Sequence, residues 1–401
     1  MSRSPAPRRR ATLASLAAEL KVSRTTISNA YNRPDQLSAD LRDRVLATAK
    51  QLGYPGPDPV ARSLRTRKAG AVGLMITEPL NYSFSDPAAL DFVAGLAESC
   101  EEAGQGLLLV AIGPKRSLDD GSAAVLAAGV DGFVVYSASD DDPYLSVVQQ
   151  RHLPIVVVDQ PKDAPGTSRV CIDDREAMRL LAEHVVGLGH REIGLLTMRL
   201  GRDWPHGGPK PALADPDRVQ TPHFHVQRER IHGVHDAMTA AGLDPASLTV
   251  VESYEHLPTS GGAAAEVALD ENPRITALMS TADVRALSAM DHLRAKGVYV
   301  PGQMTVTGFD GVPEALRRGL TTVVQPSMEK GRRAGRLLHN PPRSGLPVIE
   351  VLETEVVRGR TAGLRQMFVA LHHGHRCRIE SGRSHRVVHP VHPLALDMEM
   401  R

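Results

Sequence analysis

Polar side chains suited to contacting a nucleic acid are concentrated near the N-terminus. They are Ser23, Arg24, Thr25, Thr26, Ser28, Asn29 and Asn32. Hydroxyl groups bond to phosphate oxygens, whereas arginine and amide groups form paired hydrogen bonds with base edges. Hydroxyl and β-branched residues are mediocre helix formers, so helix propensity does not explain their presence on a predicted helix at 24–31. We therefore predict that this helix lies in a major groove, with its hydroxyl groups on phosphates and Arg24, Thr25 and Asn29 toward base edges.

Two further predicted helices would hold this polar helix in place. Residues 13–20 carry leucine and alanine at helical spacing behind Thr12, a suitable N-cap, and Ser23 can cap the polar helix. A third helix at 38–52 has one apolar stripe and stops at Gly53. A helix, a short turn, a polar helix and a supporting helix in this order indicate a helix-turn-helix.

The segment that follows joins a stiff linker to a short cationic run. Residues 53–59 are rich in glycine and proline, and residues 60–68 hold four basic side chains and one leucine. Such a run is too short to be a stable helix alone, which suits an element that folds in a minor groove. Leu64 would then wedge a base step while Arg62 and Arg65 neutralise phosphates. An ordinary basic linker fits the same residues equally well.

Charge separates the N-terminal part from the rest of the chain. Residues 1–68 hold 14 Lys and Arg against 5 Asp and Glu, a net charge of +9, and residues 69–401 hold 33 against 41, a net charge of −8. A basic head on an acidic body is expected when one part meets a polyanion and the other does not. Composition alone also allows a basic segment whose charge is merely solvated.

Length and composition bound the protein class. A chain of 401 residues predicts two or three domains. We expect no transmembrane helix, because no apolar stretch reaches 18 residues, and no signal peptide, because residues 11–20 are too polar for its core. Cys100, Cys171 and Cys377 stand far apart, which argues against disulfides and a zinc site. The sequence therefore predicts a cytoplasmic protein without a bound metal or cofactor.

From residue 71 onward, short apolar runs alternate with amphipathic segments of helical period. The runs lie at 72–76, 107–110, 132–136, 155–159, 193–196, 248–251, 277–280 and 304–310. Continuous Val, Ile and Leu separated by helices indicate parallel sheets covered on both faces. The pattern restarts near residue 173, which predicts two α/β halves with a ligand cleft at the carboxyl ends of their strands.

The N-terminal motifs resemble those of the lactose/galactose-repressor family. In chain order they are Thr12-Leu13, residues 22–32, Val45-Leu46, Leu52-Gly53-Tyr54 and residues 59–64. The resemblance implies that Arg24, Thr25 and Asn29 read bases, and that Leu64 enters the minor groove at the axis of a homodimer. Tyr31 departs from the usual aliphatic residue. The linker has one residue more than the commonest form, and Asp58 stands where asparagine is usual.

The body resembles the effector-binding core of the same family, itself similar to periplasmic sugar-binding proteins. The resemblance spans roughly residues 12–363 and rests mainly on residues 172–174, 188–191, 230–233, 276–283, 306–310 and 325–326. It implies an all-α helix-turn-helix head plus an α/β periplasmic-binding-protein-like body of two doubly wound parallel-sheet subdomains. We predict a head at 1–54, a hinge at 55–69, a core at 70–365 and a disordered tail at 366–401.

The same resemblance implies an effector site between the two halves. Its predicted residues are Phe84, Ser85, Asp86, Asp159, Arg230 and Asp310. An arginine offers a rigid fork of donors and aspartates accept from hydroxyl groups, as a sugar or nucleobase requires. Ala282 stands where the family usually has asparagine, so the usual pattern of sugar-hydroxyl contacts is not assumed. Asp159 could equally be a turn residue.

Several other residues favour structural roles. Asp173, Asp174 and Asp283 stand at predicted helix starts and are more easily N-caps than ligands. His184 and His190 are six residues apart, so they do not share a helix face and do not suggest a metal site. The six histidines after residue 370 lack the spacing of known zinc modules.

Residues 199–225 form a long Pro- and Gly-rich excursion that holds Trp204, the chain's one tryptophan. Loops of this length are usually functional or mobile. Trp204 is equally well a stacking wall for a ring-shaped ligand or a surface residue.

These patterns favour a DNA-binding transcription regulator, acting as a repressor, whose affinity for a pseudo-palindromic operator is set by a small-molecule effector. One alternative is a solute-binding protein of a transport system, against which the basic head argues. An enzyme is a second alternative, but no GxSxG, Walker A, GxGxxG or HExxH motif supplies a nucleophile or a phosphate cradle. We therefore expect no catalytic residues.

Overall fold

The computed structural model describes residues 11–57, 63, 66–113, 116–254, 259–341 and 345–365. Two predicted hinge contacts, Leu64 and Arg65, lie outside these residues, and so does the predicted tail at 366–401.

The head is a bundle of three helices, α1 (Leu13–Leu20), α2 (Arg24–Asn32) and α3 (Ala39–Leu52), with a short 3-10 turn η1 (Pro34–Gln36) after α2. The helices begin at Thr12, Ser23 and Ser38, whose side chains accept from backbone N–H groups of the first turn. Gly53 ends α3 with φ +67°, a conformation that costs glycine little. The predicted helices are therefore confirmed, and Leu16, Ile27 and Val45 form their common core.

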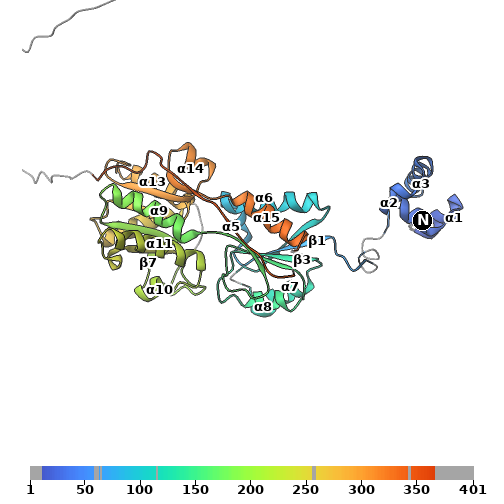
Figure 1. Cartoon of the computed structure of the whole chain (residues 1–401), viewed down its shortest axis with the longest axis horizontal. Coiled ribbons are helices and arrows are strands. Elements are labelled where there is room, and N and C mark those ends of the chain that lie inside the picture. The colour runs from blue at the N-terminus through green and yellow to red at the C-terminus, as the bar shows by residue number, and fades with distance from the viewer. Residues whose placement is uncertain are drawn as a thin grey trace, which may run out of the picture. The chain divides into compact units, whose positions relative to one another are not determined.

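The body contains two sheets, whose central strands are parallel (Figure 1). The first has six parallel strands in the order β12 (Ile349–Leu352), β5 (Ser168–Ile172), β4 (Ile155–Val158), β3 (Gly132–Tyr136), β1 (Ala71–Ile76) and β2 (Gly106–Ala111). The second has seven, in the order β13 (Glu355–Val357), β11 (Thr321–Val324), β10 (Thr305–Asp310), β9 (Ala277–Ser280), β6 (Ile193–Met198), β8 (Thr249–Ser253) and β7 (Ala212–Leu213). Its two edge strands, β13 and β7, are antiparallel.

Helices cover both faces of each sheet, which explains the uninterrupted apolar runs of the strands. On the first sheet one face is covered by α6 (Pro87–Glu102) and α15 (Ser327–His339), and the other by α7 (Leu118–Ala127) and α8 (Pro143–Gln149). On the second, α9 (Asp174–Gly187) and α11 (His225–Ala240) cover one face, and α12 (Ser260–Glu271) and α13 (Asp283–Ala295) the other. Three short helices, α5 (Leu80–Ser85), α10 (Pro216–Gln220) and α14 (Pro313–Arg317), lie in connecting segments. The predicted fold class is confirmed.

The chain returns to the first subdomain after completing most of the second. Helix α15 and strand β12 belong to the first sheet although both follow β11 of the second. The division near residue 173 did not anticipate this return. The reason lies in α15 itself, whose buried face consists of Ser327, Lys330, Gly331, Ala334, Gly335 and Leu338. The helix is strongly amphipathic, but its buried face includes Lys330 and only one large apolar residue, Leu338, so it lacks a continuous stripe of Val, Ile and Leu.

Helices α6 and α15 lie side by side in contact along their backbones (Figure 1). A Cβ at Gly331 would overlap the carbonyl oxygen of Phe92, and one at Gly95 would overlap that of Met328. An ion pair between Arg332 and Glu98, at 2.6 Å, joins the same two helices at their surface. This seam fixes the distance between the two helices.

Gly331→Ala is expected to lower the free energy of unfolding, because its methyl group must push the α6 backbone away. Overpacking of this kind costs about 1–3 kcal/mol, measurable by urea unfolding. Gly187→Ala in α9, where nothing lies within 4 Å of the added Cβ, serves as the matched control. Equal stability of both variants would show that the seam tolerates separation.

Candidate DNA-binding head and effector cleft

Helix α2 presents a polar face outward and an apolar face to the core of the head. Ile27 and Ala30 are buried, whereas Arg24 and Thr25 in the first turn are exposed. Because the N-terminal turn of a recognition helix meets the base edges, these two side chains are available for that contact.

The other described residues that are predicted to contact DNA form hydrogen bonds within the head. The Ser23 hydroxyl accepts from the backbone N–H of Thr26 at 2.9 Å and also bonds to the Thr26 hydroxyl. The Asn32 amide donates to the carbonyl and hydroxyl oxygens of Ser28, at 3.0 and 3.2 Å. The Asn29 amide donates to the Gln36 side chain at 3.2 Å. These bonds fix the turn and the helix, and the DNA contacts of these side chains stay predictions.

Four of the predicted effector residues act electrostatically on one partly buried side chain, Tyr136, at the end of β3. Burial raises the Tyr136 pKa well above its ordinary value, the negative charges of Asp159, Asp86 and Asp310 raise it further, and Arg230 opposes them. The Tyr136 ring stacks on Phe92 of α6, with centroids 4.2 Å apart. Tyr136 was not predicted, because a tyrosine at the end of an apolar strand has no sequence pattern that separates it from a core residue.

The three effector residues predicted at 84–86 differ in their exposure. Asp86 is buried and caps α6 by accepting from the N–H of Ala88 at 2.9 Å. Phe84 is 57% exposed and Ser85 is also exposed. Of the three, only Asp86 belongs to the buried cluster of charges.

Arg230 on α11 is fixed by contacts within the protein. Its Nε donates to Asp174 at 2.8 Å, its Nη1 donates to the Thr281 carbonyl at 2.6 Å, and its guanidinium lies 3.6 Å from the centre of the Phe309 ring. Arg230 and Asp174 are both buried. Two of the guanidinium nitrogens that were expected to donate to an effector therefore already donate to acceptors within the protein.

Asp310 and Asp159 are joined through Lys330 and Gln325. Lys330 Nζ donates to Asp159 at 2.5 Å and to the Gln325 side-chain oxygen at 2.6 Å, and the Gln325 amide donates to Asp310 at 2.7 Å. Asp159 and Asp310 both have positive φ, +63° and +121°, so each ends its strand in a sharp turn. Asp159 is thus a turn residue within the charged cluster, and its predicted contact with an effector stays a prediction.

The helix-start aspartates have three different roles. Asp173 caps α9 by accepting from the N–H of Glu176 at 2.9 Å, as predicted. Asp174 instead pairs with Arg230. Asp283 lies one residue inside α13 and is no cap, since it accepts from the Thr322 hydroxyl and the Val312 N–H, at 2.6 and 2.8 Å. The cap interpretation is therefore wrong for Asp174 and Asp283, because buried partners from other elements claim their oxygens.

The charges of this cluster do not balance. Each of its two cations, Arg230 and Lys330, already pairs with a carboxylate. Within the described residues, Asp283 and Asp310 form no ion pair with a cation. Burial raises the pKa of Asp310 well above its usual range, and the nearby charge of Asp86 raises it further. The cluster suits a ligand that donates hydrogen bonds and carries no negative charge.

A buried ion pair joins the two subdomains. Glu78 follows β1 of the first sheet, and Arg199 follows β6 of the second; both Arg199 Nη atoms donate to the Glu78 carboxylate. Arg228 pairs with Asp140 across the same divide at 2.7 Å. Neither pair was predicted. The residues of the first pair are 121 positions apart in the sequence and those of the second are 88 apart, so neither pair leaves a local sequence signal.

The excursion at residues 199–225 is held by a buried carboxylate. Glu252 on β8 is fully buried and accepts from His206, Arg218 and the N–H of Leu200, at 2.8 to 3.1 Å. Trp204 packs edge-on against His206 and at a tilt against Tyr254, with centroids 4.7 and 5.5 Å apart. Strand β7 within the excursion covers the edge of the second sheet.

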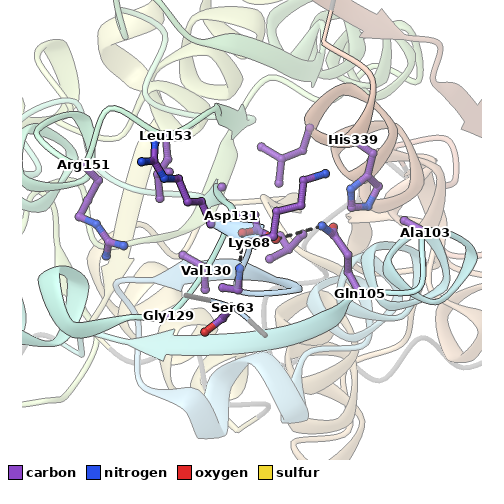
Figure 2. A pocket seen from close by; sticks show the side chains of 15 residues that line it. Ser63, Lys68, Ala103, Gln105, Gly129, Val130, Asp131, Arg151, Leu153 and His339 are labelled. Atoms are coloured by element: carbon purple, nitrogen blue, oxygen red, sulfur yellow. Dashed lines mark hydrogen bonds between the residues drawn. The ribbon is translucent and has the colours of Figure 1, made fainter. Parts of the chain in front are cut away.

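A separate cavity lies at the amino ends of the first sheet, where the chain enters the core from the linker (Figure 2). The carboxylate of Asp131 accepts from the N–H groups of Ala69 and Gly70, at 2.6 and 2.8 Å, and from Gln105. Lys68 and His339, the last residue of α15, both line the cavity. The end of the linker is thus fixed beside the carboxyl end of α15.

This fold and these sites define a class of protein, a helix-turn-helix head joined to a periplasmic-binding-protein-like body. Residues 69–206 match the family model described as "Periplasmic binding proteins and sugar binding domain of LacI family", and residues 182–362 match the "Periplasmic binding protein-like domain". The chain belongs to the LacI family of HTH-type transcriptional regulators. The resemblance to lactose and galactose repressors is confirmed at this level.

Three relatives illustrate the similarity. An HTH-type transcriptional regulator of Mycolicibacterium smegmatis is 85% identical over 363 residues, which are 90% of this chain and 99% of the relative. The crystal structure of a LacI-family regulator from Corynebacterium glutamicum is 34% identical, with TM-score 0.68 over 89% of this chain and 100% of that one. A complex of the transcriptional regulator CelR with cellobiose is 26% identical, with TM-score 0.61 over 88% and 100%. These relatives are described as regulators, not as enzymes.

Within the part of the chain that the structure describes, no helix is long and apolar enough to cross a membrane. The same residues contain no group of three His, Cys, Asp or Glu side chains placed to hold a metal ion. His190 bonds instead to Thr276 and to the Gly363 carbonyl, at 2.9 and 3.0 Å.

Asp283→Asn is expected to flatten the pH dependence of stability. Burial raises the Asp283 pKa from 3.8 to about 7, so the folded protein keeps a proton there that the unfolded chain releases near pH 4. Raising the pH from 4 to 7 therefore destabilises the parent through this group, and the effect is complete above pH 7. Urea unfolding of parent and variant at several pH values measures it. Parallel stability curves would contradict the assignment.

Proposed function

We propose that the protein is a transcriptional repressor whose affinity for operator DNA is controlled by a sugar or nucleoside bound between its two subdomains. The observation that carries the proposal is the pairing of an exposed recognition-helix turn, at Arg24 and Thr25, with a buried carboxylate cluster at the carboxyl ends of two sheets. The heads of a homodimer would read a pseudo-palindromic operator. Family membership supports this proposal, as does the cellobiose bound by CelR.

The excess of carboxylates narrows the class of effector. Asp283 and Asp310, which form no ion pair with a cation among the described residues, both come from the second subdomain. Closing the subdomains around a neutral ligand rich in hydroxyl groups lets these oxygens accept hydrogen bonds. A phosphorylated or carboxylated ligand would add negative charge to a site whose cations are already paired. The effector we propose is therefore uncharged.

Two helices provide a physical connection between this site and the linker. Helix α6 begins at Asp86, and α15 carries Lys330, the partner of Asp159, near its first turn. Their carboxyl ends reach the cavity beside Lys68, where Ala103 and His339 form part of the wall (Figure 2). The close contacts at Gly95 and Gly331, here called the glycine seam, hold α6 and α15 at one distance. A shift of these helices at the cleft would therefore also move their carboxyl ends beside the linker. Linkage further requires that the effector bind one conformation better than the other.

Arg24→Ala is expected to weaken operator binding and to relax base choice at one position. A paired arginine–base contact is worth about 1–3 kcal/mol, which is about five- to 150-fold in affinity. Selection of bound DNA from a random pool identifies the operator, and mobility shifts then measure both effects. Arg42→Ala on the exposed surface of α3 removes the same charge and is the control. Equal losses in both variants would reduce the role of Arg24 to general electrostatics.

Asp310→Asn is expected to abolish the response of operator binding to the effector while leaving operator affinity itself intact. The amide oxygen can still accept from Gln325, whereas the amide nitrogen cannot accept from the Asp283 N–H or from a ligand hydroxyl group. The test is DNA binding across a panel of sugars and nucleosides, for parent and variant. A variant that responds like the parent would move the effector away from this cluster.

The second candidate is a solute-binding protein of a transport system. Such a protein would bind the same sugars, but the ligand would not change any affinity for DNA. The DNA-binding measurements above separate the two functions.

A further inference from the structure

A cavity of about 370 Å³ lies between the two subdomains, and none of the six predicted effector residues is among its lining residues. Its walls come from the loops after β1, β2 and β3 on one side, and from the loop after β6 and the start of α11 on the other. These are the carboxyl ends of parallel strands, where open α/β sheets bind ligands. Small-molecule sites measure about 300–1,000 Å³, so the cavity holds one small group.

The carboxylates of this cavity already have partners. Asp141 bonds to His223 at 3.0 Å, Asp203 pairs with Arg218 at 3.0 Å, and Asp142 caps α8. None of them therefore demands a cation from a ligand.

Hydrogen-bond donors, in contrast, are in excess. Arg116 from the first subdomain and Arg202 from the second each donate one hydrogen bond, from Nη1 to a backbone carbonyl, at 2.9 and 3.4 Å. Arg199 is only 5% exposed, and its Nε has no hydrogen-bond partner among the described residues. A buried donor of this kind is rarely left unpaired in a functional state. The cavity therefore offers donors from both subdomains to the oxygens of a ligand.

Aromatic rings complete the wall. The Arg199 guanidinium lies 5.3 Å from the ring centre of Phe224 and 5.6 Å from that of Tyr254. Phe224 and Tyr144 line the cavity directly. Flat apolar faces beside hydrogen-bonding groups suit a ring with C–H groups on its face and hydroxyl groups on its edge.

Gln160 connects this cavity to the effector cluster. It directly follows Asp159 and is buried. Its side-chain oxygen accepts from the N–H of Val226 at 2.8 Å, two residues beyond Phe224, and its amide donates to Ser137, two residues before Ser139 of the cavity wall. The cluster and the cavity are therefore neighbouring parts of one cleft.

We propose that this cavity is a second subsite, and that the effector has two polyhydroxylated units. One unit binds at Arg230 and Asp310, and the other binds between Arg116 and Arg202. The excursion at 199–225 supplies Arg202 and His223, and the buried Glu252 keeps this segment in place. The inference rests on the proposed function, because it presumes a sugar-like effector in the cleft.

The experiment uses the fluorescence of Trp204, the chain's one tryptophan, which contacts Tyr254 beside Arg199. The full-length protein is titrated with one-unit and two-unit saccharides, beginning with glucose and cellobiose. We expect the parent to bind a two-unit ligand at least about tenfold more tightly than its single unit. The double variant Arg116→Gln/Arg202→Gln should lose about tenfold on the two-unit ligand and stay within about twofold on the single unit.

Arg317→Gln, which removes a 74% exposed side chain on α14, is the matched control and should bind both ligands as the parent does. Equal affinity of the parent for one and two units, or equal weakening of both by the double variant, would overturn the second subsite and leave the proposed function standing. If no saccharide of either length changes the fluorescence or the operator affinity, the effector class fails, and the subsite fails with it.

Discussion

Buried charge at the carboxyl ends of two parallel sheets is the constraint on which the rest of this structure depends. Arg230, Lys330 and Arg199 are all nearly excluded from solvent, and each pairs with a carboxylate from a different element. Breaking such a pair leaves an uncompensated charge in the interior, which costs about 3–5 kcal/mol. The positions of the strand ends, of α15 and of the 199–225 excursion are therefore tied to one another through these contacts.

The same constraint explains how the site could respond to a ligand. Lys330 links α15 to Asp159, and Gln325 links it to Asp310, so the first turn of α15 contacts strand ends from both sheets. A ligand that hydrogen-bonds to Asp310 would change this balance directly. Because α15 has no freedom to separate from α6 along the glycine seam, a change at its first turn is expected to reach the linker as a rigid displacement.

The sequence predicted most of the fold because its signals are local. Capped helices and apolar runs depend on neighbouring residues, and the head and the central strands could be located from them. Asp159, Arg230 and Asp310 followed from the family resemblance alone, and their contact with an effector stays a prediction. Helix α15 escaped detection because its buried face combines small residues with Lys330 and has one large apolar residue, Leu338. Glu78–Arg199 and Lys330–Asp159 could not be foreseen, since such pairs depend on loops that only the tertiary fold brings together. Phe84 was predicted to contact the effector, but its ring is exposed although Asp86, two residues later, is buried. Closeness in sequence to a buried residue therefore does not predict burial.

The central claim is that one conformational equilibrium connects the cleft with the head. Thermodynamic linkage demands that operator DNA change the affinity for the effector by the same factor as the effector changes the affinity for operator. Titrating the effector against Trp204 fluorescence, with and without saturating operator, measures this directly. We predict a change of about fivefold or more that matches the effect of the ligand on DNA binding. An effector affinity that operator DNA leaves unchanged would contradict the account.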